Sequence, residues 1–153
     1  IEVPYGSNIK YEIDKETNLL RLDRILSTSM TYPGNYGFFP NTLAGDNDPL
    51  DALLITSYSL QPGIIVNTKI IGVLITVDEK GEDEKMIVVP SDSVDPGFKD
   101  INDIFDIDEN LKKRIIHFFK NYKVLEEGKW VEVKDFKDSN FAKELYNKSL
   151  LKK

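Results

Sequence analysis

The sequence contains no cysteine, and this absence excludes several kinds of site. A disulfide framework, a thiolate nucleophile and a cysteine-ligated zinc site are all ruled out. The phosphate-binding loop GxxxxGKS or GxxxxGKT is also absent, so side chains and metal ions must hold any bound phosphate. The only histidine, His117, is expected to pack, to cap a helix or to contact another subunit.

Long apolar runs are absent as well. No stretch approaches the roughly 20 consecutive apolar residues that a membrane-spanning helix requires. Residues 1–4 show neither the basic region nor the apolar region of a secretory signal peptide. Together with the lack of cysteine, this predicts a cytoplasmic protein that does not bind membranes.

Positive charge is in deficit, with 20 Lys and Arg against 26 Asp and Glu, and the net charge is −6. An acidic surface repels nucleic acid, whose binding depends on neutralising phosphates, so no nucleic-acid partner is expected. A smaller phosphate compound would need metal ions or a few well-aimed cations to offset this acidity. The length of 153 residues predicts a single domain over 1–153.

The first two-thirds of the chain carries strand patterns, rich in β-branched residues or alternating in polarity. The expected strands span 9–13, 20–25, 52–55, 64–77 and 86–89. Gly72 interrupts the longest of them, which suggests a bend or bulge. Turn residues cluster at 6–8, 33–35, 62–63 and 80–81.

The last third shows helical spacing. Asp108 is placed to cap a helix that Gly128 would end, and Ser139 is placed to cap a second helix. The apolar stripe of the first helix comprises Leu111, Ile115, Phe118, Phe119 and Tyr122. Short strands followed by helices indicate the α+β class. We expect a small closed OB-like β-barrel of about five strands with two C-terminal helices packed on it.

Three carboxylates lie within six residues at Asp46, Asp48 and Asp51. Unit charges about 4 Å apart repel by on the order of 4 kcal/mol at an effective dielectric near 20, so such a loop is either solvated or wrapped around a cation. Mg²⁺ favours carboxylate oxygens. An EF-hand calcium loop is excluded because its fifth, sixth and twelfth positions would be Leu50, Asp51 and Ser57.

A second acidic stretch spans 78–84, between two expected strands. Read alone, it is typical of a solvated hairpin loop. If both acidic loops meet at one end of a small barrel, however, they form a pocket able to hold more than one metal. Lys10 and Glu12, two residues apart on a strand, share a face of that strand.

At this point the chain resembles the soluble inorganic pyrophosphatases of family I, prokaryotic type, over nearly its whole length. The segments that carry the resemblance are Ile9-Lys10-Tyr11-Glu12, Asp23-Arg24, Tyr32-Pro33-Gly34-Asn35-Tyr36-Gly37, Asp46 to Asp51, Asp78 to Lys85, and Phe118-Phe119 through Tyr122-Lys123. Their joint order and spacing is far more specific than any one of them. Two features depart from the family pattern: the segment before Lys10 is shorter, and the chain starts closer to Glu2. Both bear only on the role that the resemblance implies for Glu2.

The resemblance implies a role for each matching residue. Asp46, Asp51 and Asp83 are expected to bind an activating Mg²⁺, and Asp78 and Glu12 further metals, with Glu2 as a possible additional acid. Substrate contacts are expected from Lys10, Arg24, Tyr36, Lys85, Tyr122 and Lys123. Several Mg²⁺ ions would bind in each site, with Mn²⁺ as a substitute, and the family implies a homo-oligomer, with a hexamer favoured.

The implied reaction is the hydrolysis of pyrophosphate to two orthophosphates. A metal-bridged water or hydroxide would attack directly, with Asp48 as general base and with Mg²⁺, Lys, Arg and Tyr holding the phosphates. Two alternatives come from other classes: a non-catalytic OB-like binding module, and a metal-dependent hydrolase of nucleotides or phosphate esters. The first predicts a basic, aromatic sheet face, and the second needs a base-binding or ester-binding pocket.

Overall fold

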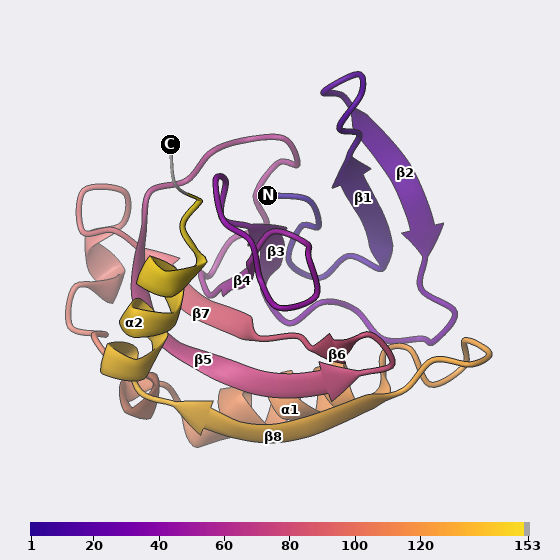
Figure 1. Ribbon diagram of the computed structural model, residues 1–153. Coiled ribbons are helices and arrows are strands. Elements are labelled where there is room, and N and C mark those ends of the chain that lie inside the picture. The colour runs from indigo at the N-terminus through magenta and orange to yellow at the C-terminus, as the bar shows by residue number, and fades with distance from the viewer. Residues whose placement is uncertain (152–153) are drawn as a thin grey trace.

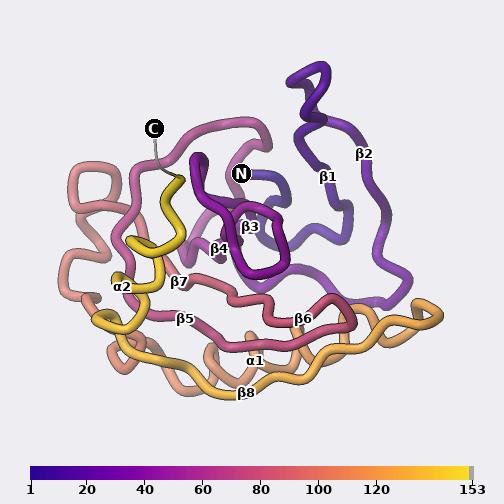
Figure 2. Tube along the Cα trace, in the orientation of Figure 1, coloured from indigo at the N-terminus to yellow at the C-terminus, as the bar shows by residue number. Residues whose placement is uncertain are grey.

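The computed structural model describes residues 1–151, in which a mixed β-sheet carries one α-helix on each face (Figures 1 and 2). The sheet order is β3 (Asn35–Phe38), β4 (Asp51–Leu54), β7 (Lys85–Pro90) and β5 (Thr68–Asp78). The short β6 (Gly81–Glu82) and the long β8 (Val131–Lys137) also pair with β5. Only β4 and β7 are parallel to each other among these pairs.

A separate antiparallel hairpin stands beside this sheet (Figure 1). It consists of β1 (Ile9–Ile13) and β2 (Leu20–Ile25), with Lys10 directly opposite Arg24. The N-terminal segment runs to the sheet, where Val3 forms an antiparallel bridge with Tyr36 of β3. The hairpin therefore forms a wall of its own rather than an extension of the main sheet.

The two α-helices bury opposite faces of the sheet. The helix α1 (Glu109–Asn121) places Ile115, Phe118 and Phe119 in the larger core cluster, against Leu53 and Ile87 of the sheet. The helix α2 (Ser139–Ser149) covers the other face, where Ala142 joins a second cluster. Burial of apolar surface at about 25 cal/mol per Å² holds these layers together. None of the described helices is long and apolar enough to cross a membrane.

Gly72 forms the irregularity that the sequence predicts. The pairing of β5 with β7 shifts register between Ile70 and Gly72, which marks a bulge. A Cβ atom at Gly72 would lie 2.8 Å from Cβ of Ile104, in the short helix η2 (Ile104–Asp106), and 2.9 Å from the carbonyl oxygen of Lys137. Glycine is thus needed because η2 and β8 approach the bulge closely.

The α+β class is confirmed, but strand pairings over residues 1–151 form an open sheet and a hairpin, and no closed ring of about five strands is found there. The reason is that β1 and β2 pair only with each other in this part of the chain. Three strands, β3, β6 and β8, lie outside the expected set. A second short helix, η1 (Pro96–Phe98), precedes η2.

The helix boundaries need two corrections. Asp108 caps α1 as predicted, accepting a hydrogen bond from Leu111 N, but α1 ends at Asn121 rather than near Gly128. Consecutive turns follow, and Gly128 adopts a left-handed φ of 75° within them. The cap of α2 is Asp138, which accepts from Phe141 N at 2.9 Å, rather than Ser139. The His117 side chain is exposed on α1, which excludes a core role.

Candidate active site

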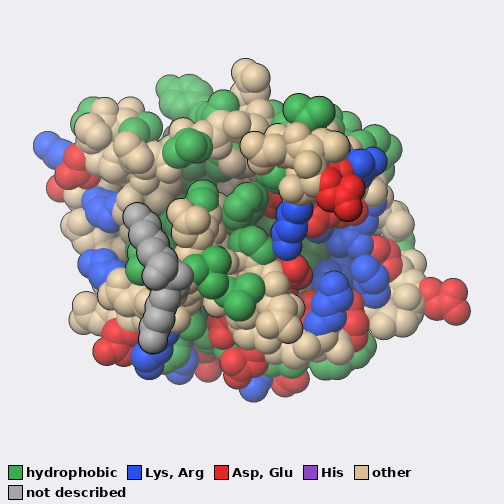
Figure 3. Space-filling view, turned by 45° about the horizontal axis from the view of Figure 1, so that its top comes forward, with side chains coloured by type: hydrophobic (Ala, Val, Ile, Leu, Met, Phe, Trp, Pro, Cys, Tyr) green, Lys and Arg blue, Asp and Glu red, His purple; other side chains and the backbone are tan. Residues whose placement is uncertain are grey.

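A cleft of about 400 Å³ lies between the hairpin and one end of the sheet. Figure 3 shows acidic and basic side chains crowded around a hollow on this face. The cleft brings together every residue that the sequence singles out as a site residue. These are Glu2, Lys10, Glu12, Arg24, Tyr36, Asp46, Asp48, Asp51, Asp78, Asp83, Lys85, Tyr122 and Lys123. Residues far apart in the sequence thus form one surface, although their roles are not fixed by this proximity.

The side of the cleft that the main sheet forms is called the sheet wall. The register of β3, β4 and β7 explains which side chains meet at its centre. Asp51 pairs with Lys85 across the parallel strands β4 and β7. Tyr36 lies on the same face because Phe38, two residues along β3, is opposite Asp51. The Lys85 ammonium therefore reaches the Tyr36 hydroxyl at 2.6 Å and Asp51 Oδ2 at 2.8 Å. The same sheet face carries the apolar core, so the site begins where that core ends.

Lys85 is the buried charge at the centre of this wall. Its Nζ atom also lies 2.8 Å from Asp83, and its side chain is 3% exposed. Burial alone would lower the pKa of Lys85, but the Asp51 charge, the two tyrosines nearby and Asp83 raise it well above its usual value. Burial raises the pKa of Asp83, and Lys85 opposes that shift. The lysine thus stays charged and offsets two carboxylates.

The loop that precedes β4 carries the acidic triplet. Asp46 accepts a hydrogen bond from Asp48 N at 3.1 Å, and Asn47 between them adopts a left-handed φ of 65°. Burial raises the pKa of Asp46, and the charges of Asp48 and Asp51 add to that rise. Asp48 itself is exposed at the cleft. Of the three carboxylates, Asp51 pairs with Lys85, whereas Asp46 and Asp48 take part in no ion pair among residues 1–151.

The end of β5 and the segment after α1 form a second ion pair. Lys123 Nζ donates to Asp78 Oδ2 at 3.2 Å. Burial opposes the charge of Lys123, yet Tyr122 and Asp78 raise its pKa above the usual value. Burial likewise opposes the charge of Asp78, but hydrogen bonds from Lys80 N and Lys123 lower its pKa overall. Tyr122 stacks on Phe118 with ring centroids 5.0 Å apart, so its ring packs in the core.

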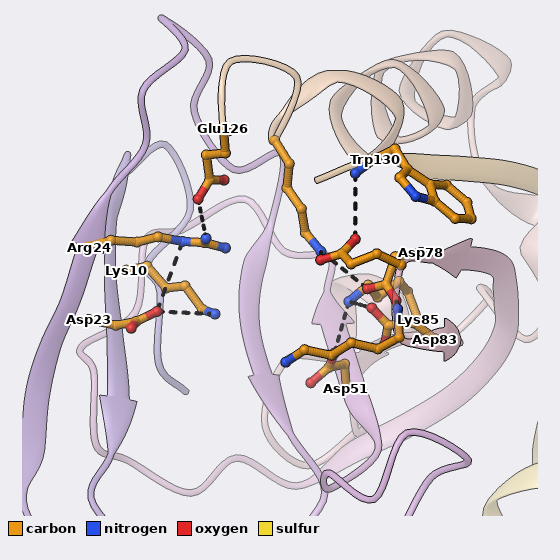
Figure 4. Close-up of polar contacts among 12 residues, drawn as sticks. Lys10, Asp23, Arg24, Asp51, Asp78, Asp83, Lys85, Glu126 and Trp130 are labelled. Carbon is orange, nitrogen blue, oxygen red and sulfur yellow. Dashed lines mark hydrogen bonds and ion pairs between the residues drawn. The ribbon is translucent and has the colours of Figure 1, made fainter. Parts of the chain in front are cut away.

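The hairpin supplies the opposite wall. Lys10 Nζ lies 3.3 Å from Asp23, which is also 4.0 Å from Arg24 Nε. Arg24 forms a further ion pair with Glu126, in the segment between α1 and β8. Figure 4 shows Lys10 and Arg24 extending from the hairpin toward the side where Asp51, Asp78 and Lys85 lie. Glu12 lines the cleft from the same hairpin and is exposed.

Glu2 lies buried between the hairpin and the sheet. Its carboxylate accepts a hydrogen bond from Ile13 N at 3.2 Å, at the end of β1. Burial raises the pKa of Glu2 to about 7, and the hydrogen bond from Ile13 opposes this rise. The position at the cleft agrees with the sequence interpretation of Glu2 as a possible further acid.

The carboxylates suit a hard divalent cation by their chemistry, since Mg²⁺ prefers oxygen ligands and keeps some of its waters. Among residues 1–151, no three Asp, Glu or His side chains converge into a ready-made metal cluster. The Lys85 ammonium, between Asp51 and Asp83, explains part of this spacing. Burial is the main cause of the raised pKa values of Asp46 and Asp83, the neighbouring carboxylates add to the rise, and a bound cation would oppose it. The donor set therefore fits Mg²⁺.

Five charged residues that line the cleft are not among the predicted site residues. They are Lys15, Asp23, Glu79, Lys80 and Lys129. Asp23 and Glu79 lie within the motifs that carry the family resemblance, so adjacency to assigned residues was the available signal. Lys129 follows the turn glycine Gly128, and only the folded chain shows that this turn borders the cleft.

Comparisons with known proteins agree with this geometry. The family model described as inorganic pyrophosphatase matches residues 1–152. An inorganic pyrophosphatase of Saccharolobus solfataricus is 48% identical over 153 residues, covering 100% of this chain and 89% of that protein. One from Campylobacter jejuni is 45% identical over 150 residues, covering 98% and 87%.

Solved structures show the same similarity in three dimensions. The inorganic pyrophosphatase from Helicobacter pylori superimposes with a TM-score of 0.96 at 45% identity, covering 98% of this chain and 88% of that one. The enzyme from Thermus thermophilus gives a TM-score of 0.94 at 45% identity, with coverage of 98% and 86%. With its cleft lined by acidic and basic side chains, the chain belongs to the inorganic pyrophosphatase family.

Proposed function

We propose that this protein hydrolyses inorganic pyrophosphate to two orthophosphates in the cleft between the hairpin and the sheet. The observation that carries the proposal is the arrangement of charges in that cleft. Carboxylates and cations alternate on its two walls, which suits a substrate that is bound together with metal ions. Membership of the family supports the same reaction.

Mg²⁺, or Mn²⁺ in its place, is the proposed cofactor, with several ions in each site. Asp46, Asp51 and Asp83 would hold the activating ion, and Asp78 and Glu12 further ions, with Glu2 as an additional acid. When bound, such ions neutralise phosphate oxygens and lower the pKa of bound water toward neutrality. Their binding would also relieve the repulsion that raises the pKa of Asp46.

The chain's own cations would hold the substrate. Lys10 and Arg24 would approach pyrophosphate from the hairpin, and Lys85 and Lys123 from the sheet side. The hydroxyls of Tyr36 and Tyr122 would add hydrogen bonds. Tyr36 already lies 2.6 Å from the Lys85 ammonium, so the two would act on one phosphate group. Preorganised donors of this kind stabilise charge that develops on a leaving group.

Asp48 is the proposed general base for direct attack of water on phosphorus. Its carboxylate lines the cleft, is exposed, and takes part in no ion pair among residues 1–151. A carboxylate that no cation neutralises is available to accept a proton from water. No covalent intermediate with the protein is needed, since no activated serine, cysteine or histidine is involved.

Substrate competition tests the proposed specificity. Phosphate release is measured from pyrophosphate, from ATP and from a simple phosphate monoester, each with Mg²⁺. We expect pyrophosphate to be the preferred substrate by a large factor, because the cleft is lined mostly by charged side chains, which suit two phosphate groups better than a base or an apolar ester group. Equal or faster release from ATP or the monoester would favour the phosphohydrolase alternative instead.

Assembly and location complete the proposal. We propose a cytoplasmic homo-oligomer, with a hexamer favoured and without nucleic-acid or membrane partners. Exposed apolar side chains on the hairpin, Leu20, Leu22 and Ile25, support contact between copies. Light scattering after size exclusion is expected to give a multiple of 17.5 kDa, and a monomer at micromolar concentration would contradict the assembly.

A further inference from the structure

The segment 122–130, between α1 and β8, borders the cleft and is tied to it near both ends. Near its start, Lys123 pairs with Asp78 at 3.2 Å. At its end, Trp130 N donates to Glu79 Oε2 at 3.5 Å (Figure 4). Between these anchors Glu126 N donates to Lys123 O at 2.9 Å, so the turn itself is defined. This leaves the Glu126 side chain in a fixed position facing the hairpin.

Glu126 connects the segment to the hairpin through Arg24. One Nη atom of Arg24 donates to the Glu126 carboxylate, and both side chains are largely buried, with 23% and 20% exposure. Asp23 lies beside both Arg24 and Lys10, which are cross-strand neighbours. Lys10, Asp23 and Arg24 therefore form one connected group of charges on the hairpin. Glu126 connects this group to the segment between α1 and β8.

The guanidinium of Arg24 is planar and carries five N–H donors, so holding one nitrogen fixes the direction of the others. Its Nε atom is buried and has no hydrogen-bond partner among residues 1–151. Figure 4 shows the group held by Glu126 on one side and extending toward the cleft on the other. We propose that Glu126 is a positioning residue, which orients Arg24 so that its free donors face a phosphate group of the substrate. This inference rests on the proposed pyrophosphate hydrolysis.

The charges predict how loss of Glu126 would affect the kinetics. In Glu126→Ala, Arg24 keeps its positive charge, so its attraction for pyrophosphate persists and a nearby negative charge disappears. The guanidinium, however, is free to sample other rotamers. Orientation matters most in the transition state, where misplacement of a group by about 1 Å can cost as much as 10²-fold. We therefore expect kcat to fall about tenfold while KM changes by less than about threefold.

The test measures kcat and KM for pyrophosphate hydrolysis with saturating Mg²⁺. The variants are Glu126→Ala, Glu126→Gln, which keeps an oxygen acceptor for Arg24, and the control Glu127→Ala at the exposed neighbouring position. The glutamine variant is expected to recover part of kcat, and the control to match the wild type. Thermal unfolding should shift little, since partly exposed ion pairs contribute about 1 kcal/mol or less.

A double-mutant cycle separates positioning from a general structural effect. In an Arg24→Lys background, the ammonium cannot use a planar fork of donors, so Glu126→Ala is expected to cause no further loss of kcat. An unchanged kcat in Glu126→Ala, or an equal loss in both backgrounds, would overturn the inference while leaving the proposed function intact. A folded wild-type protein that releases no phosphate would overturn the proposed function, and this inference with it.

Discussion

Asp48 is the residue on which the proposed chemistry depends most directly. In Asp48→Asn the amide cannot accept a proton from water, whereas the exposed position leaves the fold intact. We expect kcat to fall by about 10²- to 10⁴-fold at neutral pH, with Mg²⁺ binding retained. The measurement combines steady-state rates with calorimetric Mg²⁺ titration, and Asp100→Asn, exposed on a distant loop, is the control. Near-normal turnover would remove Asp48 from the role of base.

Lys85 yields a prediction about the protein without metal. Its ammonium compensates Asp51 and Asp83 at 2.8 Å each, so Lys85→Met leaves two carboxylates without their cation. Breaking a buried ion pair on one side costs about 3 kcal/mol, and we expect that loss of unfolding free energy in EDTA. Because Mg²⁺ can replace the missing charge, it should stabilise the variant more than the wild type. Denaturant unfolding with and without Mg²⁺ checks this.

The control for this prediction is Lys120→Met, which alters an exposed lysine on α1. It should respond to Mg²⁺ as the wild type does. If Lys85→Met gains no more from Mg²⁺ than this control gains, the carboxylates around Lys85 do not share their charge with a metal.

Single site residues are predicted best from the sequence where several residues of a motif lie close together along the chain. All the site residues expected from it line the cleft, since the family resemblance covers them together. Lys85 was expected to bind substrate, but its contacts with Asp51 and Tyr36 depend on strand register, which composition does not reveal. Glu126 could not be found because its partner, Arg24, is 102 residues away along the chain.

Between elements, Asp103 joins η2 to α2. Its carboxylate accepts hydrogen bonds from Phe105 N at 3.2 Å and from Ser139 N at 3.1 Å. Burial would raise the pKa of Asp103, but these hydrogen bonds lower it overall. A lowered folded-state pKa means that the stabilisation is present above the unfolded value of 3.8 and is lost as the pH falls through the folded value.

We therefore expect Asp103→Asn to reduce the unfolding free energy by about 1 kcal/mol at pH 7. The difference from the wild type should shrink as the pH falls below 3.8, where the wild-type carboxyl becomes protonated. Urea unfolding at several pH values measures this, with Asp100→Asn as the control. A difference that stays constant down to pH 2.5 would show that the charge of Asp103 is not what stabilises the junction.

Some elements were predictable from local pattern and others were not. The hairpin strands β1 and β2 coincide with the predicted ranges, and the bulge at Gly72 was expected. The strand β8 partly buries Val131, Val133 and Phe136, but the alternation breaks between Val133 and Phe136. The strand also lies in the segment between the two expected helices, to which the sequence analysis assigns no element. The strand β3 begins at Asn35, within a stretch whose Pro and Gly residues indicate a turn.

At the scale of the molecule, the cleft exists because two separate sheets face each other. The pattern of short strands followed by helices predicts the α+β class, and the structure adds that the hairpin is a wall distinct from the main sheet. Closure into a barrel depends on non-local pairing, which no local pattern specifies. The charged side chains of the two walls thus meet only in the folded protein, with Glu2 and Glu126 linking the walls at Ile13 and Arg24.

The most direct test of the whole account is phosphate release from pyrophosphate with Mg²⁺, with excess EDTA, and after Mg²⁺ is restored. Rapid release that EDTA abolishes and Mg²⁺ recovers is the expected result, because the cleft needs a divalent cation to compensate its carboxylates. Circular dichroism in EDTA confirms that the protein stays folded in the inactive state. A folded protein that releases no phosphate with either Mg²⁺ or Mn²⁺, or that remains equally active in EDTA, would contradict the proposed metal-dependent pyrophosphate hydrolysis.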